Sequence, residues 1–214
     1  TSLGSLGGAG LSAAVYALHS NGDTLYVGGN FANAGSDPDA DKIAKWDASS
    51  GFSSLSSTSL NGIVYALATV GSDLYMGGIF TDAGSDPDAD RWAVWDGTRI
   101  SSVGGIPLGA NVRAMTTIGT DLYIGGNFLN ADGDGDADYI AKWDGTTLTP
   151  LSSVILNSGV RALASIGNTL YIGGSFTNVG GDANADRVIQ WDGNAFSAID
   201  SAVLNNTGFA LATT

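Results

Sequence analysis

Hydrophobic residues recur along the chain in short runs separated by glycine, asparagine, aspartate and serine. The first runs are 15–18 and 25–29, a third is 43–47, and the pair Phe52 and Leu55 completes the series. Each run is rich in β-branched and aromatic residues and is bounded by turn-forming residues, which is typical of strands. None has the spacing of an amphipathic helix. The pattern therefore predicts four short antiparallel strands in succession.

The same series occurs four times, at a spacing of about 48 residues. The repeats cover residues 15–63, 64–111, 112–159 and 160–207, with partial repeats at 1–14 and 208–214. A four-stranded unit repeated at this spacing is typical of a β-propeller, in which each blade buries its faces against its neighbours. We therefore expect one all-β β-propeller domain over residues 1–214, built of four-stranded antiparallel blades.

The connections between the predicted strands carry turn residues. Gly22-Asp23 and its counterparts favour tight hairpins between the first and second strands. The pairs Asp96-Gly97, Asp144-Gly145 and Asp192-Gly193 lie between the third and fourth strands. An Asp-Gly pair in a hairpin favours a type I′ turn, so we expect type I′ turns there.

Two recurrent motifs carry a family resemblance. The second strand reads Leu25-Tyr26-Val27-Gly28-Gly29, and the third ends in Trp46-Asp47, with close copies in every repeat. The glycine doublet and the downstream tryptophan resemble kelch-type repeats. They are more similar still to secreted bacterial and fungal propeller repeats, including those of cortical cell-polarity marker proteins. This resemblance implies the propeller fold, but no single function, because propellers host many activities.

Strand-like segments overhang at both ends of the chain, and at least one of them is surplus. Leu3 and Leu6 match the last strand of a unit, and residues 209–213 match the first strand of another. A closed four-bladed ring needs only one such segment. Unpaired strand edges are normally covered, so we expect a longer array or pairing of these terminal strands with a neighbouring molecule.

The composition excludes several classes of function. The net charge is −13 and the eight Lys and Arg residues are scattered, so no nucleic-acid partner is expected. Cysteine is absent, which excludes disulfides and thiol chemistry, and no apolar run reaches the roughly 20 residues of a membrane span. The abundance of Ser, Thr, Asn and Gly favours an extracellular or cell-surface location. The start at Thr1 without Met suggests a processed or excised chain.

All 21 acidic residues are aspartates, and many lie in one loop of each repeat. Carboxylates at positions i, i+2 and i+4 match the first three ligand positions of D-x-D-x-D calcium loops. The sequence therefore predicts calcium binding, strongest in the third repeat and weakest in the fourth. The predicted ligands are Asp37, Asp39 and Asp41; Asp86, Asp88 and Asp90; Asp132, Asp134, Asp136 and Asp138; and Asp182, Asn184 and Asp186.

A second interpretation of these loops stays open. An EF-hand loop needs a glycine at its sixth position and a glutamate at its twelfth, and the chain contains no glutamate. The loops are then solvated acidic turns, in which the aspartates form Asx turns and pair with the following Lys42, Arg91 or Arg187.

Catalytic chemistry is not indicated. The single histidine, His19, has no acid–base partner in the sequence pattern, and four equivalent units argue against one active site. We expect a non-enzymatic extracellular calcium-binding module with a structural or adhesive role, self-assembling through its terminal strands. Its partners are then other copies of itself, surface proteins or glycans. The alternatives are a glycan-binding lectin-like propeller and a non-catalytic fragment of a larger secreted enzyme.

Overall fold

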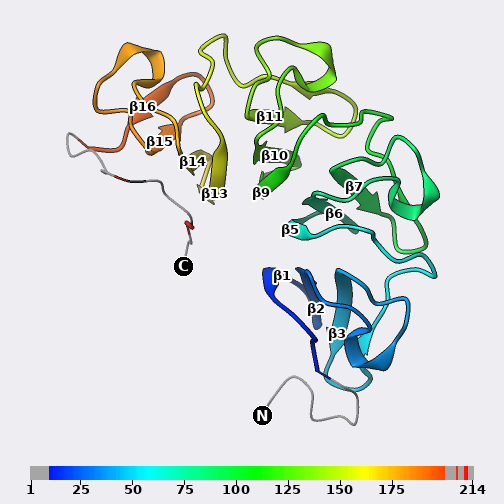
Figure 1. Cartoon of the computed structure of the whole chain (residues 1–214). Helices are drawn as coiled ribbons and strands as arrows, with labels where there is room; N and C mark the ends of the chain where they lie inside the picture. The colour runs from blue at the N-terminus through cyan, green and yellow to red at the C-terminus, as the bar shows by residue number, and fades with distance from the viewer. Residues whose placement is uncertain (1–9, 201–205, 207–209, 212–214) are drawn as a thin grey trace. The chain divides into compact units, whose positions relative to one another are not determined.

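The computed structural model describes residues 10–200, 206, 210 and 211. These residues form four antiparallel sheets of four strands, and in each sheet the strands follow one another in chain order (Figure 1). Helical structure in the described part is limited to four short 3-10 turns. The predicted all-β, propeller-like architecture of four blades is therefore confirmed.

The four blades share one layout: two longer strands, a 3-10 turn, and two shorter strands. Their bounds are β1 Val15–Asn21, β2 Thr24–Gly29, η1 Ala34–Ser36, β3 Ile43–Asp47 and β4 Gly51–Ser53 in the first blade; β5 Val64–Val70, β6 Asp73–Gly78, η2 Ala83–Ser85, β7 Trp92–Trp95 and β8 Ile100–Ser101 in the second; β9 Val112–Ile118, β10 Asp121–Gly126, η3 Ala131–Gly133, β11 Ile140–Trp143 and β12 Leu148–Thr149 in the third; and β13 Val160–Ile166, β14 Thr169–Gly174, η4 Val179–Gly181, β15 Val188–Trp191 and β16 Phe196–Ala198 in the fourth.

The chain divides into two compact units between Pro107 and Leu108. The first unit contains the first and second blades, and within it β5 packs against β1 and β2. The second unit contains the third and fourth blades, and within it β13 packs in the same way against β9 and β10. The same blade-to-blade contact is therefore seen twice, once in each unit.

Apolar side chains fill the space between the paired blades. In the first unit Tyr26 and Ile43 of the first blade join the core cluster of the second blade, which includes Val64 and Trp95. The rings of Tyr26 and Trp95 meet edge to face, with centroids 6.1 Å apart. Such a pair contributes beyond its buried area, because the ring edge lies against the negative face of its partner.

The glycine doublet sets how closely two blades approach. A Cβ atom added at Gly28 would lie 2.6 Å from Cγ1 of Val64, the first residue of β5. That distance is shorter than a van der Waals contact, so only glycine allows β5 to lie this close to β2.

The first strand of every blade contains a β-bulge. In the second blade Val64 pairs with Gly78 and Ala66 pairs with Gly77, so Tyr65 is the extra residue of the bulge. The same register shift places Tyr16, Arg113 and Arg161 at the bulge in the other three blades. A bulge bends the strand and increases its local twist.

The turns match the sequence predictions in part. Asn21 pairs with Thr24, so Gly22 and Asp23 form the predicted two-residue hairpin. The prediction of type I′ turns at the Asp-Gly pairs is wrong. A type I′ turn needs positive φ at both central residues. The N–H of Asp96 donates to the carbonyl oxygen of Arg99 at 3.2 Å, so the central residues are Gly97 and Thr98. Gly97 has φ 96°, but neither Asp96 nor Thr98 has positive φ, and the same holds in the turns that begin at Asp144 and Asp192.

The predicted overhanging strands, at Leu3 and Leu6 and at 209–213, lie outside the described residues apart from Ala210 and Leu211. No helix in the described part of the chain is long and apolar enough to cross a membrane.

Candidate functional site

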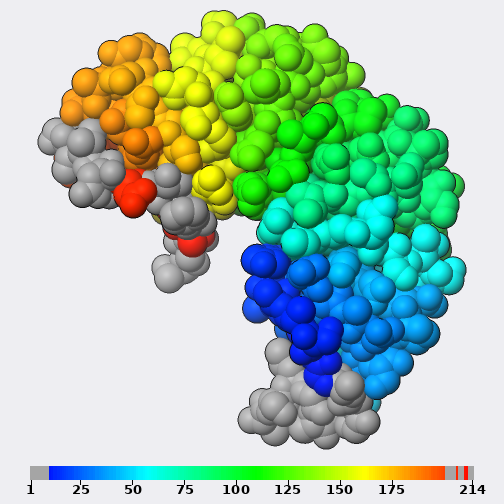
Figure 2. Space-filling model, in the orientation of Figure 1, coloured from blue at the N-terminus to red at the C-terminus, as the bar shows by residue number. Residues whose placement is uncertain are grey.

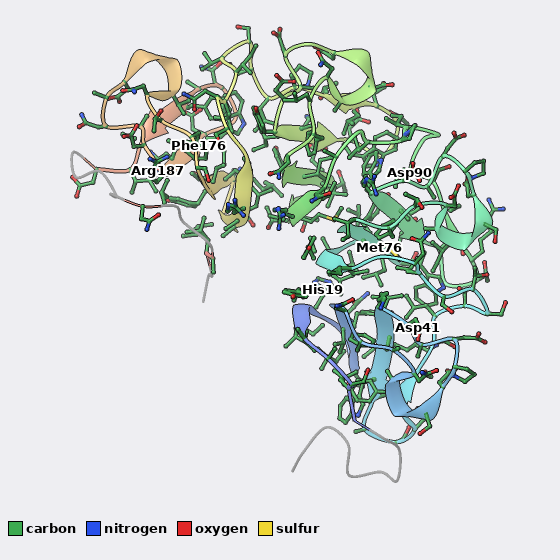
Figure 3. All side chains as sticks on the ribbon, viewed as in Figure 1. His19, Asp41, Met76, Asp90, Phe176 and Arg187 are labelled. Atoms are coloured by element: carbon green, nitrogen blue, oxygen red, sulfur yellow. The ribbon has the colours of Figure 1, made fainter. Side chains whose placement is uncertain are left out.

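The aspartate loops join the second and third strands of each blade, and Figure 3 labels Asp41 and Asp90 in the loops of the first two blades. Each loop begins at a residue in the left-handed region, followed by a 3-10 turn. These residues are Asn33 (φ 52°), Asp82 (φ 50°), Asn130 (φ 49°) and Asn178 (φ 51°). Asparagine and aspartate tolerate this conformation better than other non-glycine residues, which explains their recurrence here.

The last aspartate of each loop closes it. Oδ1 of Asp41 accepts a hydrogen bond of 2.8 Å from the backbone N–H of Asn33, eight residues earlier. The same bond recurs in the other blades, from Asp82 to Asp90 (2.9 Å), from Asn130 to Asp138 (2.7 Å) and from Asn178 to Asp186 (2.6 Å). This carboxylate therefore holds the left-handed residue at the start of its own loop.

The first aspartate of each loop forms an Asx turn. Oδ1 of Asp86 accepts from the N–H of Asp88 (3.1 Å), and the bond recurs from Asp39 to Asp37, Asp136 to Asp134 and Asn184 to Asp182. In the first two blades the second oxygen is also used. Oδ2 of Asp86 accepts from both the N–H and the hydroxyl of Ser102, at 2.9 and 2.8 Å.

These bonds favour the ionised form of the first aspartate. The backbone N–H of Ser102 is the largest cause of a lowered pKa at Asp86, followed by the Ser102 hydroxyl. The pKa of Asp37 is likewise lowered, chiefly by the backbone N–H of Ser54, which donates to its Oδ2 at 2.8 Å. In the third repeat the equivalent position is Pro150, which has no N–H to donate.

The middle position of each loop contributes its backbone rather than its side chain. Asp88 and Asp136 are exposed, and their carboxylates make no hydrogen bond within the described residues. Asp132, the extra acidic residue of the third repeat, has φ 54° and occupies a position held by a positive-φ glycine in the other repeats. It is therefore exposed in a turn, outside the set of bonded carboxylates.

The basic residues that follow three of the loops, Lys42, Arg91 and Arg187, donate to backbone oxygens rather than to the loop aspartates. Nη1 of Arg91 donates to the backbone oxygens of Ile79 and Phe80, at 2.8 and 3.3 Å. Arg187 makes the same contacts in the fourth blade, where Figure 3 labels it beside Phe176. In the second interpretation of the loops, the Asx turns are thus present and the predicted ion pairs are not.

The arrangement does not fit a three-carboxylate calcium site. Calcium takes about six to eight oxygen ligands that converge on one point. Here the first and last carboxylates bind backbone N–H groups, and the middle carboxylate makes no hydrogen bond within the described residues. Among the described residues no group of three or more acidic or histidine side chains is placed to hold a metal ion. Calcium binding stays a prediction that these contacts do not favour.

A second set of aspartates follows the tryptophans. Oδ1 of Asp96 accepts from the N–H and hydroxyl of Thr98 (2.8 and 2.6 Å) and from the N–H of Arg99 (2.9 Å). The Thr98 hydroxyl is the largest cause that lowers the pKa of Asp96 to about 2. Equivalent bonds lower the pKa of Asp47, Asp144 and Asp192. Because the carboxylate binds the turn backbone, this turn does not need the type I′ conformation.

The remaining candidate residues also have structural surroundings. Nε2 of His19 lies 2.9 Å from Oγ1 of Thr69 in the neighbouring blade, and burial lowers the pKa of this histidine. Trp92, Trp95, Trp143 and Trp191 are all buried. These four rings therefore offer no open face on which a sugar could stack, which the lectin-like alternative would need.

Comparison with known proteins shows the fold alone. No protein-family model and no curated protein matches the chain. Among solved structures, it is similar to the computationally designed Ika8 protein, with 19% identity and a TM-score of 0.55 over 94% of this chain and 53% of that one. It is also similar to YjhT, with 11% identity and a TM-score of 0.54 over 89% of this chain and 66% of that one. The chain thus spans about half to two thirds of the length of these structures.

Proposed function

We propose that the protein is a non-catalytic repeat scaffold of the extracellular space or cell surface, with a structural and adhesive role. One observation carries the proposal. In all four repeats the first and last loop aspartates bind the loop's own backbone, as the post-tryptophan aspartates bind their turns. The first and last aspartates thus fix the conformation of their loops, because their carboxylates are engaged by backbone N–H groups rather than poised for acid–base or nucleophilic chemistry.

Burial supports the same reading. No polar or charged residue is fully buried among the described residues, and His19, whose pKa is lowered by partial burial, contacts the hydroxyl of Thr69 rather than an acid. The chain instead presents four similar loops, each closed by the same hydrogen bond. Equivalent sites that bind weakly one at a time can bind strongly together, which suits adhesion to a repetitive surface. The L-Y-x-G-G and W-D motifs support a relationship with kelch-type and secreted cortical-marker-type repeats.

The adhesive role can be tested with coated microspheres. Beads carrying the chain, at a density too low for bead–bead aggregation, are passed over films of cellulose, chitin and mannan, with albumin-coated beads as the control. We expect retention on at least one polysaccharide film above the albumin control. No retention on any film would contradict an adhesive role towards glycans, and release of reducing sugar from a film would show an enzyme.

A matched variant tests whether the loops make the contact. Replacing Asp39, Asp88 and Asp136 together by asparagine neutralises the middle position of three loops, as Asn184 already does in the fourth. These side chains are not part of the backbone bonds, so the fold should be unchanged by circular dichroism. If the loops contact the film, retention changes in this variant. Unchanged retention would place the contact elsewhere.

A further inference from the structure

The first blade carries an apolar face that is covered in the other blade of its unit. Leu18 is 61% exposed, whereas the equivalent Leu67 of the second blade is 8% exposed. Val15 is 39% exposed, whereas the equivalent Val64 is fully buried. The dark-blue residues of β1 lie at the surface in Figure 2. We call Leu11, Val15, Leu18, Leu25, Trp46 and Phe52 the leading face; each is exposed or half-buried.

The second blade shows what covers such a face. Its Val64, Leu67 and Trp95 form one cluster with Tyr26 and Ile43 of the first blade. The second unit repeats the arrangement: Val160, Leu163 and Trp191 of the fourth blade cluster with Tyr123 and Ile140 of the third. In both units, the face equivalent to the leading face is therefore covered by a tyrosine and an isoleucine from the preceding blade.

The fourth blade has the complementary residues with less cover. Tyr171 and Val188 occupy the positions of Tyr26 and Ile43, and both are half-buried rather than buried. Ile166 is 60% exposed, whereas its counterpart Ile118 in the third blade packs against the core cluster shared with the fourth. We call Ile166, Tyr171 and Val188 the trailing face.

We infer that the leading face docks on the trailing face of a second copy of this chain. The docked pair repeats the contact that joins the two blades within each unit, with Tyr171 of one copy against Trp46 of the other, as Tyr26 lies against Trp95. This deepens the proposed function by naming the surface through which the scaffold assembles. It replaces pairing of the terminal strands with packing of blade faces.

Three features favour a second copy as the occupant. The two faces lie on different blades and differ in sequence, so copies join head to tail, and such contacts build rings or filaments. Both faces are apolar, so the net charge of −13 is not concentrated on the contact. The Ika8 chain also extends about as far again beyond the part that this chain matches, since 53% of it is covered. A second copy supplies a comparable length of chain.

The inference can be tested with paired cysteines, because the chain has none of its own. In the second unit Oγ1 of Thr116 lies 3.5 Å from Oγ of Ser165, and His19 contacts Thr69 at the same positions in the first unit. The equivalent pair across the proposed contact is Ala164 and Ser20. The test variant is S20C/A164C, and the matched control is T116C/S165C, whose cysteines lie between two blades of one unit.

After mild oxidation, S20C/A164C is expected to give covalent species at multiples of 21.6 kDa on a non-reducing gel. The control is expected to keep the monomer mass while losing its free thiols. Monomer with free thiols in the test variant would overturn the inference. Monomer without free thiols would also overturn it, because the two faces would then meet within one chain.

A second measurement uses the parent chain and two charged variants in light scattering coupled to gel filtration. The parent is expected at no less than twice 21.6 kDa, and Leu18→Asp at the monomer mass with an unchanged circular dichroism spectrum. Leu129→Asp is the control, since Leu129 is also an exposed apolar residue, 50% exposed, but lies outside both faces. A monomeric parent, or equal dissociation by Leu129→Asp, would overturn the inference. The bead assay is run below the aggregation density, so failure of assembly and failure of adhesion are distinguishable.

Discussion

Asp86 and Ser102 tie two parts of the second blade together. Oδ2 of Asp86 accepts from the N–H of Ser102 at 2.9 Å and from its hydroxyl at 2.8 Å, across 16 residues of chain. Asp86→Ala leaves both donors without this partner. Because hydrogen bonds to charged groups contribute about 1–3 kcal/mol, we expect a loss of about 1–2 kcal/mol at this partly solvated site.

The loss should appear in urea-induced unfolding as a lower midpoint with an unchanged slope. Asp88→Ala is the matched control, because the Asp88 side chain is exposed in the same loop and makes no hydrogen bond within the described residues. Equal losses from the two variants would show that loop charge, rather than the bond to Ser102, sets the stability.

Replacing Asp82 by asparagine is expected to raise the stability of the fold, whereas Asp86→Ala lowers it. It has φ 50° at the position where the other three repeats have asparagine, and its N–H donates to Asp90. Asp82→Asn removes one of two nearby negative charges and places a residue well suited to the left-handed region there. We expect a gain of a few tenths of a kcal/mol, of order 0.2–0.5, measured by urea unfolding. Asp82→Ala should lose stability instead, and a gain in that variant would contradict the conformational argument.

The spacing between blades is expected to depend on Gly28. A Cβ there would meet Cγ1 of Val64 at 2.6 Å, so Gly28→Ala should destabilise the first unit by about 1–3 kcal/mol, as overpacking does. Val64→Ala removes the opposing methyl group and should recover part of the loss in the double variant. The test is a double-mutant cycle in thermal unfolding. Gly109→Ala is the control, because nothing lies within 4 Å of a Cβ at Gly109. Additive effects of the two substitutions would exclude the contact.

We expect the turns after the tryptophans to make the protein less stable in acid. Bonding to Thr98 and Arg99 lowers the pKa of Asp96 from 3.8 to about 2. A group whose pKa is lower in the folded state stabilises the fold above its unfolded pKa. That contribution should be complete above 3.8 and should disappear as the pH falls towards about 2.

The pH dependence can be assigned with Thr98→Ala, which removes the donor that lowers the pKa most. Urea midpoints measured across this pH range should fall less steeply with acid in the variant than in the parent. An identical pH profile would mean that other carboxylates govern acid unfolding. Asp192 offers an internal comparison, because its pKa is lowered mainly by backbone N–H groups without a hydroxyl donor.

Calcium gives a direct test of the loops. The bonded arrangement needs no cation, so we expect equal melting temperatures in excess chelator and in excess calcium. A ligand that binds the native state raises the melting temperature in a concentration-dependent way. A clear rise with calcium would mean that the loops rearrange to gather their carboxylates. Asp134→Asn would then report the third repeat, where Pro150 leaves Asp134 without the donor that Ser102 provides to Asp86.

The fold was largely predictable because its signals are local and repeated four times. Strand runs such as 25–29, bounded by turn residues, define the four-stranded unit. Because the unit recurs four times, the pattern is not a chance arrangement of residues. The chemistry of the loops was less accessible. An aspartate every second residue satisfies the spacing of a calcium loop and of an Asx turn alike. The distinction depends on which N–H groups the carboxylates reach. The N–H of Ser102 lies 16 residues from its acceptor Asp86, and the N–H of Asp82 is placed by a left-handed backbone.

The turns and the end faces show the same limit. Asp-Gly is a common pair in type I′ hairpins, but here the carboxylate of Asp96 binds the turn backbone. Turn propensities at two positions do not predict such a side-chain bond. The exposure of Leu18 could not be inferred from its sequence either, since Leu67 follows the same Val-Tyr-Ala run and is buried. The difference in exposure arises because the first blade has no preceding blade in its unit, and the sequence of a single repeat does not show its position among the blades.

The bulged position of the first strand is tyrosine in the first two blades and arginine in the last two. Tyr16, Tyr65, Arg113 and Arg161 are the extra residues of the bulges, so an exchange there leaves the paired residues of their own sheet unchanged. Tyr16 and Tyr65 instead contact each other, with ring centroids 5.3 Å apart. Divergence between repeats can therefore change the chemical character of this position, from aromatic in the first two blades to cationic in the last two, while the strand pairing of the sheet around it stays the same.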